Sequence, residues 1–158
     1  MANFTIRFAE EADCPLILDF IRRLADYEQL SHEVVATEAG LRESLFEQRQ
    51  AEVVLAFEDD TAVGFALFFH NYSTFLGKAG LYLEDLFVSE AYRGRGYGKA
   101  LFARLAKIAL ERNCERLDWW CLDWNRSAMD FYARLGAVPM SDWTVCRLDA
   151  AAMKRLAE

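Results

Sequence analysis

Long hydrophobic runs are missing from this sequence, and so are cysteine pairs at metal-binding spacing. No apolar stretch reaches the roughly 20 residues that a membrane-spanning helix needs, and we expect no secretory signal at the N-terminus, which has no apolar core. None of the four cysteines belongs to a CxxC pair, so no zinc site is predicted. Buried free thiols are the expected state, and they fit a cytoplasmic location.

Proline, histidine and positive charge are also scarce. The chain has two prolines and two histidines, and its 18 Lys and Arg face 25 Asp and Glu, a formal net charge of −7. Without a proline-rich linker or a repeat, residues 1–158 are predicted to form one domain. The negative charge, with no extended basic stripe, argues against nucleic-acid binding. His32 and His70 are interpreted as surface residues, not metal ligands.

Apolar residues make up 54% of the chain, and their spacing predicts an α/β fold. Alternation or dense apolar content predicts strands, and a period near 3.6 predicts helices. The helix that follows the strand at 80–88 gives a β-α-β crossover, typical of a mixed sheet flanked by helices. The expected strands cover residues 3–9, two segments around a turn at 58–60, 80–88, 115–122 and 143–148. The expected helices cover residues 13–27, a segment from 37, 98–112, 127–135 and 150–156.

Three glycines stand at alternate positions, Gly94, Gly96 and Gly98, among three basic residues, Arg93, Arg95 and Lys99. This stretch lies between a strand that ends at Val88 and a helix that begins near Gly98. Backbone N–H groups at a helix start lack partners within the helix, and together with the helix dipole they bind anions. The spacing differs from the P-loop and from the dinucleotide fingerprint. The glycines alone are equally consistent with a tight turn bearing solvated arginines.

The charge distribution changes at the same place. Residues 1–92 carry 6 Lys and Arg against 17 Asp and Glu, a net of −11, whereas residues 93–158 carry 12 against 8, a net of +4. Ordinary solvated faces explain such a difference. The alternative is that one half receives a cation and the other an anion.

Two patterns together identify a family. The pattern V-x-x-x-x-R-G-x-G-x-G begins at Val88, and N-x-x-x-x-x-F-Y-x-x-x-G-A begins at Asn125. The pair resembles the GNAT superfamily of N-acetyltransferases. Three longer stretches, over residues 4–28, 75–98 and 124–137, are similar to the spermidine/spermine acetyltransferase branch and its thialysine-acetylating relatives. The resemblance implies a splayed mixed sheet flanked by helices, usually in a homodimer, and acetyl-CoA as cosubstrate.

The resemblance also implies where coenzyme A binds. The pyrophosphate is expected on Arg93 to Lys99, which includes Tyr97. The pantetheine arm is expected along the backbone near Phe87 and Val88, as an added strand would be. Asn125 and Arg134 are further family contacts to the cofactor.

The acceptor amine must lose a proton before it attacks, because its pKa lies near 10. The resemblance favours Glu84 as the base or as the holder of a water that acts as the base, with Asp85 binding the cation. Neighbouring strand residues face opposite sides unless a bulge intervenes. Tyr132 holds the family position of the acid that protonates the departing thiolate, and Tyr27 and Glu28 hold positions that grip the acceptor.

The acceptor itself stays open at this point. The leading hypothesis is a primary amine of a small polyamine-like cation. Thialysine, another amino acid or a peptide amine would need the same chemistry. A module that senses coenzyme A without catalysis is the hypothesis from a different class, and the presence of both Glu84 and Tyr132 argues against it.

Overall fold

The computed structural model describes residues 2–158, which fall into two compact units, one up to Leu122 and one from Asp123 to Glu158. The expectation that residues 1–158 form a single domain stays a prediction.

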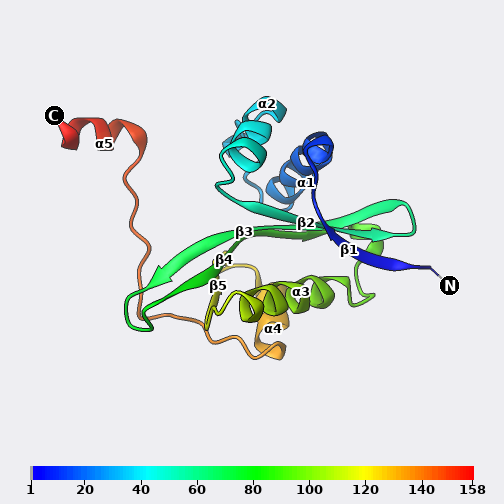
Figure 1. Ribbon diagram of the computed structural model, residues 1–158. Coiled ribbons are helices and arrows are strands. Elements are labelled where there is room, and N and C mark those ends of the chain that lie inside the picture. Colours follow the sequence, from blue (N-terminus) through cyan, green and yellow to red (C-terminus); the bar gives the residue numbers. More distant parts are fainter. Residues whose placement is uncertain (1) are drawn as a thin grey trace. The chain divides into compact units, whose positions relative to one another are not determined.

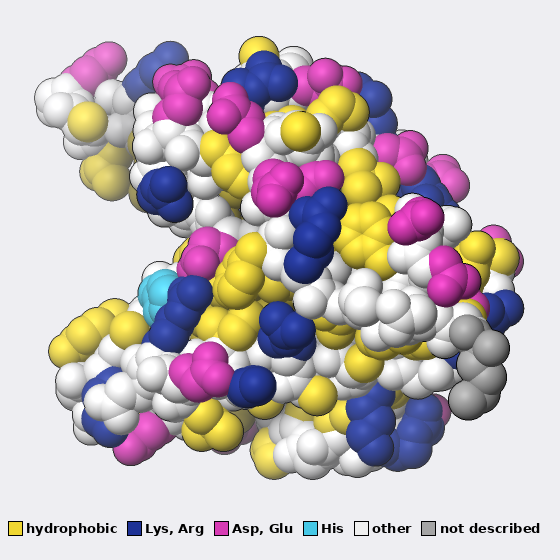
Figure 2. All heavy atoms as spheres, turned by 45° about the vertical axis from the view of Figure 1, so that its right-hand side comes forward, with side chains coloured by type: hydrophobic (Ala, Val, Ile, Leu, Met, Phe, Trp, Pro, Cys, Tyr) yellow, Lys and Arg dark blue, Asp and Glu magenta, His cyan; other side chains and the backbone are white. Residues whose placement is uncertain are grey.

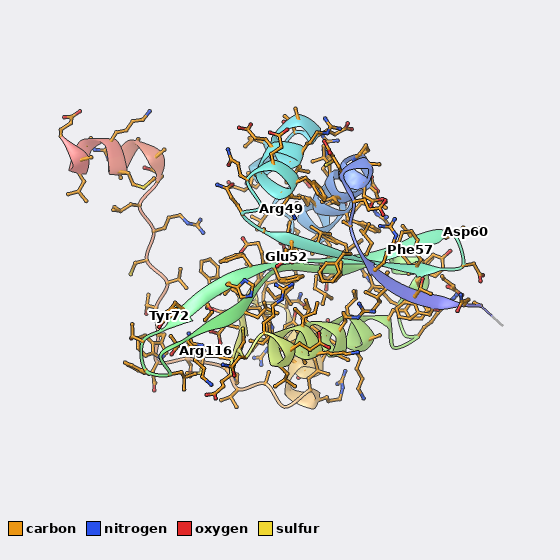
Figure 3. The ribbon with its side chains drawn as sticks, viewed as in Figure 1. Arg49, Glu52, Phe57, Asp60, Tyr72 and Arg116 are labelled. Carbon is orange, nitrogen blue, oxygen red and sulfur yellow. The ribbon has the colours of Figure 1, made fainter. Side chains whose placement is uncertain are left out.

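The first unit is built on one five-stranded sheet with the strand order β1-β2-β3-β4-β5 (Figure 1). Neighbours from β1 to β4 are antiparallel, and β4 and β5 are parallel, so the sheet is mixed as predicted. Asp60 marks the turn between β2 and β3, and Tyr72 lies near the other end of β3 (Figure 3). The strands are β1 Phe4–Phe8, β2 Glu52–Glu58, β3 Thr61–Ser73, β4 Lys78–Val88 and β5 Leu117–Trp119.

Helices cover both faces of this sheet. Helices α1 and α2 lie on one face and α3 lies on the other (Figure 1). Their bounds are α1 Cys14–Tyr27, α2 Glu38–Leu41 and α3 Tyr97–Glu111, and a π-helical stretch, η3 Arg42–Glu47, continues α2. The single turns of 3-10 helix are η1 Glu11–Asp13, η2 Ser31–Glu33 and η4 Glu90–Tyr92. The predicted β-α-β crossover is confirmed as β4, α3 and β5.

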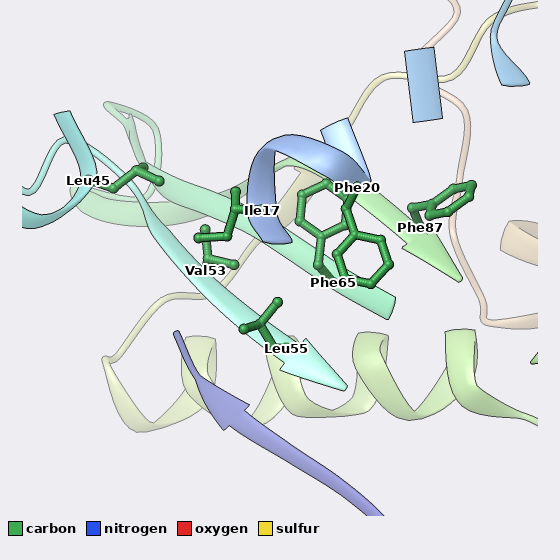
Figure 4. Packing of buried hydrophobic residues seen from close by; sticks show 7 residues of the cluster. All are labelled: Ile17, Phe20, Leu45, Val53, Leu55, Phe65 and Phe87. Carbon is green, nitrogen blue, oxygen red and sulfur yellow. The ribbon is translucent and has the colours of Figure 1, made fainter. Parts of the chain in front are cut away.

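Helix α1 supplies much of the core on its face of the sheet. Phe20 is fully buried and stacks on Phe65 of β3, with ring centroids 5.3 Å apart. Ile17 of the same helix is also fully buried, whereas Leu24 is only half-buried. The cluster comprises Ile17, Phe20, Leu45, Val53, Leu55, Phe65 and Phe87 (Figure 4). Through Phe20, which lies near both Phe65 and Phe87, it packs the middle of α1 against β3 and the end of β4.

The second unit contains the other two helices, α4 Arg126–Arg134 and α5 Ala150–Ala157. Both were predicted, and both begin at a side-chain cap. The side-chain Oδ1 of Asn125 accepts a hydrogen bond from the Ala128 N–H, and the Asp149 carboxylate accepts one from the Ala152 N–H. Gly136 has φ 94° and ends α4, as expected of a glycine after a helix.

The prediction of a strand over residues 143–148 is wrong. This segment has no regular structure, and Trp143, Val145 and Leu148 are exposed. A strand requires a neighbouring strand to pair its backbone groups. Apolar alternation shows that a segment suits a strand but does not supply that neighbour.

The burial of the cysteines was predicted only in part. Cys14 and Cys114 are buried free thiols, but Cys121 is half-buried and Cys146 is exposed, so the prediction of four buried cysteines was half right. Burial raises the pKa of the Cys14 thiol.

Among the described residues, no helix is both long and apolar enough to cross a membrane.

Candidate active site

The glycine-rich stretch forms an open loop that leads into α3. Gly94 has φ 79° and Gly96 has φ 82°, conformations that suit glycine because they crowd a Cβ. Gly96 is the N-cap of α3, and its carbonyl accepts the first bond of the helix, from the Ala100 N–H at 3.0 Å. The N–H groups of Tyr97, Gly98 and Lys99 precede that bond and have no partner within the helix. Such successive N–H groups form an anion-binding concavity.

Protein contacts fix the side chains of this loop to different degrees. The Arg95 guanidinium forms two hydrogen bonds to the Glu58 carboxylate, at 2.9 and 3.1 Å, and lies over the Tyr92 ring. The Tyr97 ring stacks on Phe4 of β1, with centroids 4.1 Å apart. Lys99 is exposed on the first turn of α3. The loop is therefore tied to β1 and to the end of β2, while its backbone N–H groups begin the helix.

Arg93 is held against aromatic rings. Its Nε donates a hydrogen bond to the Val88 carbonyl at 3.0 Å, and its guanidinium lies 5.0 Å from the centroid of Tyr27 and 5.3 Å from that of Phe87. Cations are attracted to such aromatic faces. Arg93 therefore connects the start of the loop both to the last residue of α1 and to the last residues of β4.

Strand β4 has an open edge beside this loop. It pairs with β5 only through Leu81, Tyr82 and Leu83, and no other described strand of the first unit pairs with its remaining part on that side. Phe87 and Val88 lie in this unpaired part, and their side chains are buried. An exposed strand edge accepts an extended chain with amide groups. This geometry suits the arm of coenzyme A that was expected here.

The bulge that the sequence left open is present in β4. Leu67 of β3 pairs with Asp85, and Phe68 pairs with Leu83, so Glu84 is an extra residue in the ladder. A bulge breaks the strict alternation of side chains. Glu84 is exposed, whereas Asp85 is half-buried.

Three carboxyl groups meet at the bulge. Burial, together with the charges of Glu84 and Glu28, raises the pKa of Asp85 to about 7. Burial and the charge of Glu84 also raise the pKa of Glu28, which follows the last residue of α1. Like charges held together in a poorly solvated place favour a bound cation or proton. The structure thus brings together three of the residues that were predicted to handle the amine, and places Tyr27 beside them in the sequence.

The remaining predicted residues lie on α4 in the second unit. Asn125 caps the helix, Tyr132 lies in its second half and is half-buried, and Arg134 is its last residue and is exposed. Their part in a common site with the loop and the carboxyl groups stays a prediction.

Sequence reasoning missed two residues beside the site. Glu58 holds Arg95, and nothing in the sequence pointed to that pairing across 37 positions. Arg23 lies 5.3 Å from the Phe87 centroid, and its position one helical turn before Tyr27 was a signal that could have found it. As predicted, both histidines lie at the surface: His32 is exposed beside Glu33, and His70 is exposed. Within residues 2–158, no group of three His, Cys, Asp or Glu could hold a metal ion.

Comparisons with known proteins agree with this architecture. The acetyltransferase (GNAT) family matches residues 19–137. The thialysine N-epsilon-acetyltransferase of Bos taurus is 38% identical over 99% of both chains. The L-ornithine N5-acetyltransferase of Arabidopsis thaliana is 32% identical over 96% of this chain and 86% of its own.

One solved structure has a similar fold. An integron cassette protein from the mobile metagenome of V. cholerae superimposes with a TM-score of 0.81 and 29% identity, over 98% of each chain. The overall fold of this chain is therefore shared with that solved structure. This chain belongs to the GNAT family of acetyltransferases.

Proposed function

We propose that the protein transfers the acetyl group of acetyl-CoA to a primary amine of a small polyamine-like cation. The observation that carries the proposal is the set of three carboxyl groups, Glu28, Glu84 and Asp85, at a bulge in the strand that leads to an anion-binding loop. One end of this arrangement suits phosphates and the other suits a cation.

The cofactor side is assigned to the loop and to β4. The pyrophosphate binds the N–H groups and cations between Arg93 and Lys99, and the left-handed glycines allow its oxygens to approach the backbone. The pantetheine arm lies along the open edge at Phe87 and Val88. Asn125 and Arg134 provide the further contacts of the cofactor.

The acceptor side is assigned to the carboxyl groups and Tyr27. Asp85 and Glu28 attract the protonated amine, and the exposed Tyr27 ring offers an aromatic face to it. Glu84 removes the proton, directly or through a water, because a neutral amine is the nucleophile. Tyr132, a phenol that is neutral near pH 7, returns a proton to the thiolate that leaves.

The named relatives favour a second acceptor class. Thialysine and ornithine, on which two of the similar enzymes act, are amino acids with a second amine. A peptide amine is a third candidate, and a sensor of coenzyme A is the alternative without catalysis. We propose further that the chain acts in the cytoplasm as a homodimer, without nucleic acid or membrane as a partner.

A thiol-release assay across polyamines, thialysine, lysine, ornithine and peptides tests this function. We expect at least one small cationic amine to accelerate release of coenzyme A by more than about a hundred-fold, within the range of enzymatic catalysis. If no amine accelerates it while acetyl-CoA still binds, the sensor alternative replaces the proposal.

The role of Tyr132 is tested in the same assay. We expect Tyr132→Phe to lower kcat by about a hundred-fold, the size of a general-acid contribution, with an unchanged affinity for acetyl-CoA in calorimetry. Tyr72→Phe, at an exposed tyrosine of β3, is the control and should keep full activity. Unchanged turnover of Tyr132→Phe at every pH would remove this residue from the mechanism.

A further inference from the structure

Two guanidinium groups lie over one aromatic ring at the end of β4. Arg23 and Arg93 are each 5.3 Å from the centroid of Phe87, and Arg23 is also 5.5 Å from that of Phe20. The function proposed above uses Arg93 as part of the cofactor loop. It gives no task to Arg23, which comes from α1 and not from that loop.

The charge of Arg23 is poorly compensated within the protein. Among the described residues of the first unit, Asp19 is its one ion-pair partner, at 3.6 Å, and the two side chains are 42% and 60% exposed. Exposed pairs of this length contribute little binding energy. The guanidinium therefore keeps donors for an outside anion.

Arg23 also lines an open cavity of about 640 Å³ at the end of the sheet. The hydroxyl-bearing residues Thr61 and Ser89 line it as well, and the one carboxylate in its wall, Glu90, makes no ion pair with Arg23. A guanidinium with neighbouring hydroxyl groups is the donor set that binds carboxylates in proteins. The cavity thus offers a place for a small carboxylate.

The spacing relates this place to the amine site. Asp85 and Phe87 are two residues apart on β4, a step of about 7 Å along a strand. Five single bonds join the side-chain nitrogen of ornithine to its carboxyl carbon, an extended reach of about 6 Å. A molecule with an amine at Asp85 and a carboxylate beside Phe87 is therefore a short amino acid with a terminal amine.

We propose that Arg23 binds the α-carboxylate of the acceptor, so that the protein acetylates a basic amino acid in preference to the corresponding diamine. This inference rests on the proposed acetyl transfer and narrows its acceptor. Arg23 is then a specificity-determining residue, and Arg93 adds positive potential at the same ring without leaving its place in the loop.

Matched acceptors that differ only by the carboxylate test the proposal. Ornithine is compared with 1,4-diaminobutane, and thialysine with its decarboxylated counterpart, each by initial rates at saturating acetyl-CoA. We expect the amino acid of at least one pair to have a kcat/KM at least about ten-fold above that of its diamine. We expect Arg23→Met to raise the KM for that amino acid by about ten-fold or more, with kcat little changed.

The diamine and acetyl-CoA serve as internal references. Their KM values should stay within about two-fold in Arg23→Met, because neither contact involves Arg23. Arg22→Met is the matched control, since Arg22 is the neighbouring exposed arginine of α1 and lies over no described aromatic ring. Arg23→Lys keeps the charge without the bidentate fork, so it should recover part of the preference.

Three results would overturn the inference. One is a wild-type protein that acetylates the diamines as well as the amino acids. Another is an Arg23→Met variant that loses both acceptors equally, which is the signature of a structural role. The third is a rise in the KM for acetyl-CoA alone, which assigns Arg23 to the cofactor. A wild-type protein that acetylates no amine at all would instead refute the proposed function itself.

Discussion

Asp85 is the residue whose environment departs furthest from that of an ordinary surface carboxylate. It is half-buried, and burial together with the charges of Glu84 and Glu28 raises its pKa to about 7. Burial and the charges of Glu84, Asp118 and Asp85 raise the pKa of the neighbouring Tyr82 phenol to about 12, so this side chain stays neutral near pH 7. Asp85 therefore changes charge within the range where the enzyme would work.

The pH dependence of acceptor use follows from this shift. Below about pH 7, Asp85 is protonated and attracts a cationic amine less, so the kcat/KM for the acceptor should rise between pH 6 and 8 with an inflection near 7. Asp85→Asn should lose that inflection and lower kcat/KM by about ten-fold at pH 8. Initial rates across pH test this expectation, with Glu111→Gln, an exposed carboxylate of α3, as the control.

Folding stability gives a second readout that needs no substrate. The folded state binds the Asp85 proton more tightly than the unfolded state, whose pKa is 3.8, so stability falls as pH rises from about 4 to 7 and levels off above it. The wild type should lose on the order of 2 kcal/mol relative to Asp85→Asn between pH 5 and 8. If the free energies of unfolding of the two proteins differ by the same amount at every pH, the raised pKa of Asp85 is contradicted.

At the scale of elements, the site depends on how a loop enters a helix. Gly96 caps α3 in a left-handed conformation, and a Cβ there would meet no heavy atom within 4 Å apart from those of its two neighbours in the chain. A substitution at this position therefore acts through backbone strain and not through a collision. The strain falls on the N–H groups that are proposed to hold the pyrophosphate.

The Gly96→Ala variant is tested by two measurements, its folding stability and its affinity for acetyl-CoA. We expect it to lower stability by about 1 kcal/mol, the cost of a left-handed alanine. It should also raise the Kd for acetyl-CoA by about ten-fold, because misdirected N–H groups lose charge-assisted bonds.

The matched control is Gly77→Ala in the β3–β4 turn. Gly77 has φ 67° and equally open space, but it lies away from the loop. It should lose similar stability and keep its affinity for acetyl-CoA. Equal affinities of the two variants in calorimetry would exclude the loop as the phosphate site.

Local sequence patterns predicted most elements because each carries its own signal. Pro15 and the apolar period predicted α1, and Asp149 predicted the start of α5. The bulge at Glu84 could be anticipated only as an alternative, because it depends on the register between β3 and β4. The contact of Glu58 with Arg95 depends on tertiary packing, and no local pattern reports such a contact. For Arg23, helical spacing places it on the same face of α1 as Tyr27, but its position over Phe87 again depends on packing.

At the scale of the whole molecule, the charges are uneven along the chain but mixed on the surface. The net charge is −7, with the excess of acid in residues 1–92. On the face drawn in Figure 2, positive and negative side chains are interspersed, and no broad basic area covers it. At long range, the net negative charge of the protein therefore favours cations, whereas the loop at Arg93–Lys99 is proposed to attract the phosphates of the cofactor at short range.

The dependence of kcat/KM on ionic strength tests this long-range attraction of cations. Because salt screens attraction beyond about 10 Å at 0.1 M, the kcat/KM for a cationic acceptor should fall by about three-fold between roughly 20 and 200 mM salt, with kcat nearly constant. Sucrose at equal osmolality is the control, and it should leave kcat/KM unchanged. A kcat/KM that rises with salt would mean that the acceptor meets a repulsive field, which a net charge of −7 and three carboxyl groups at the bulge do not produce.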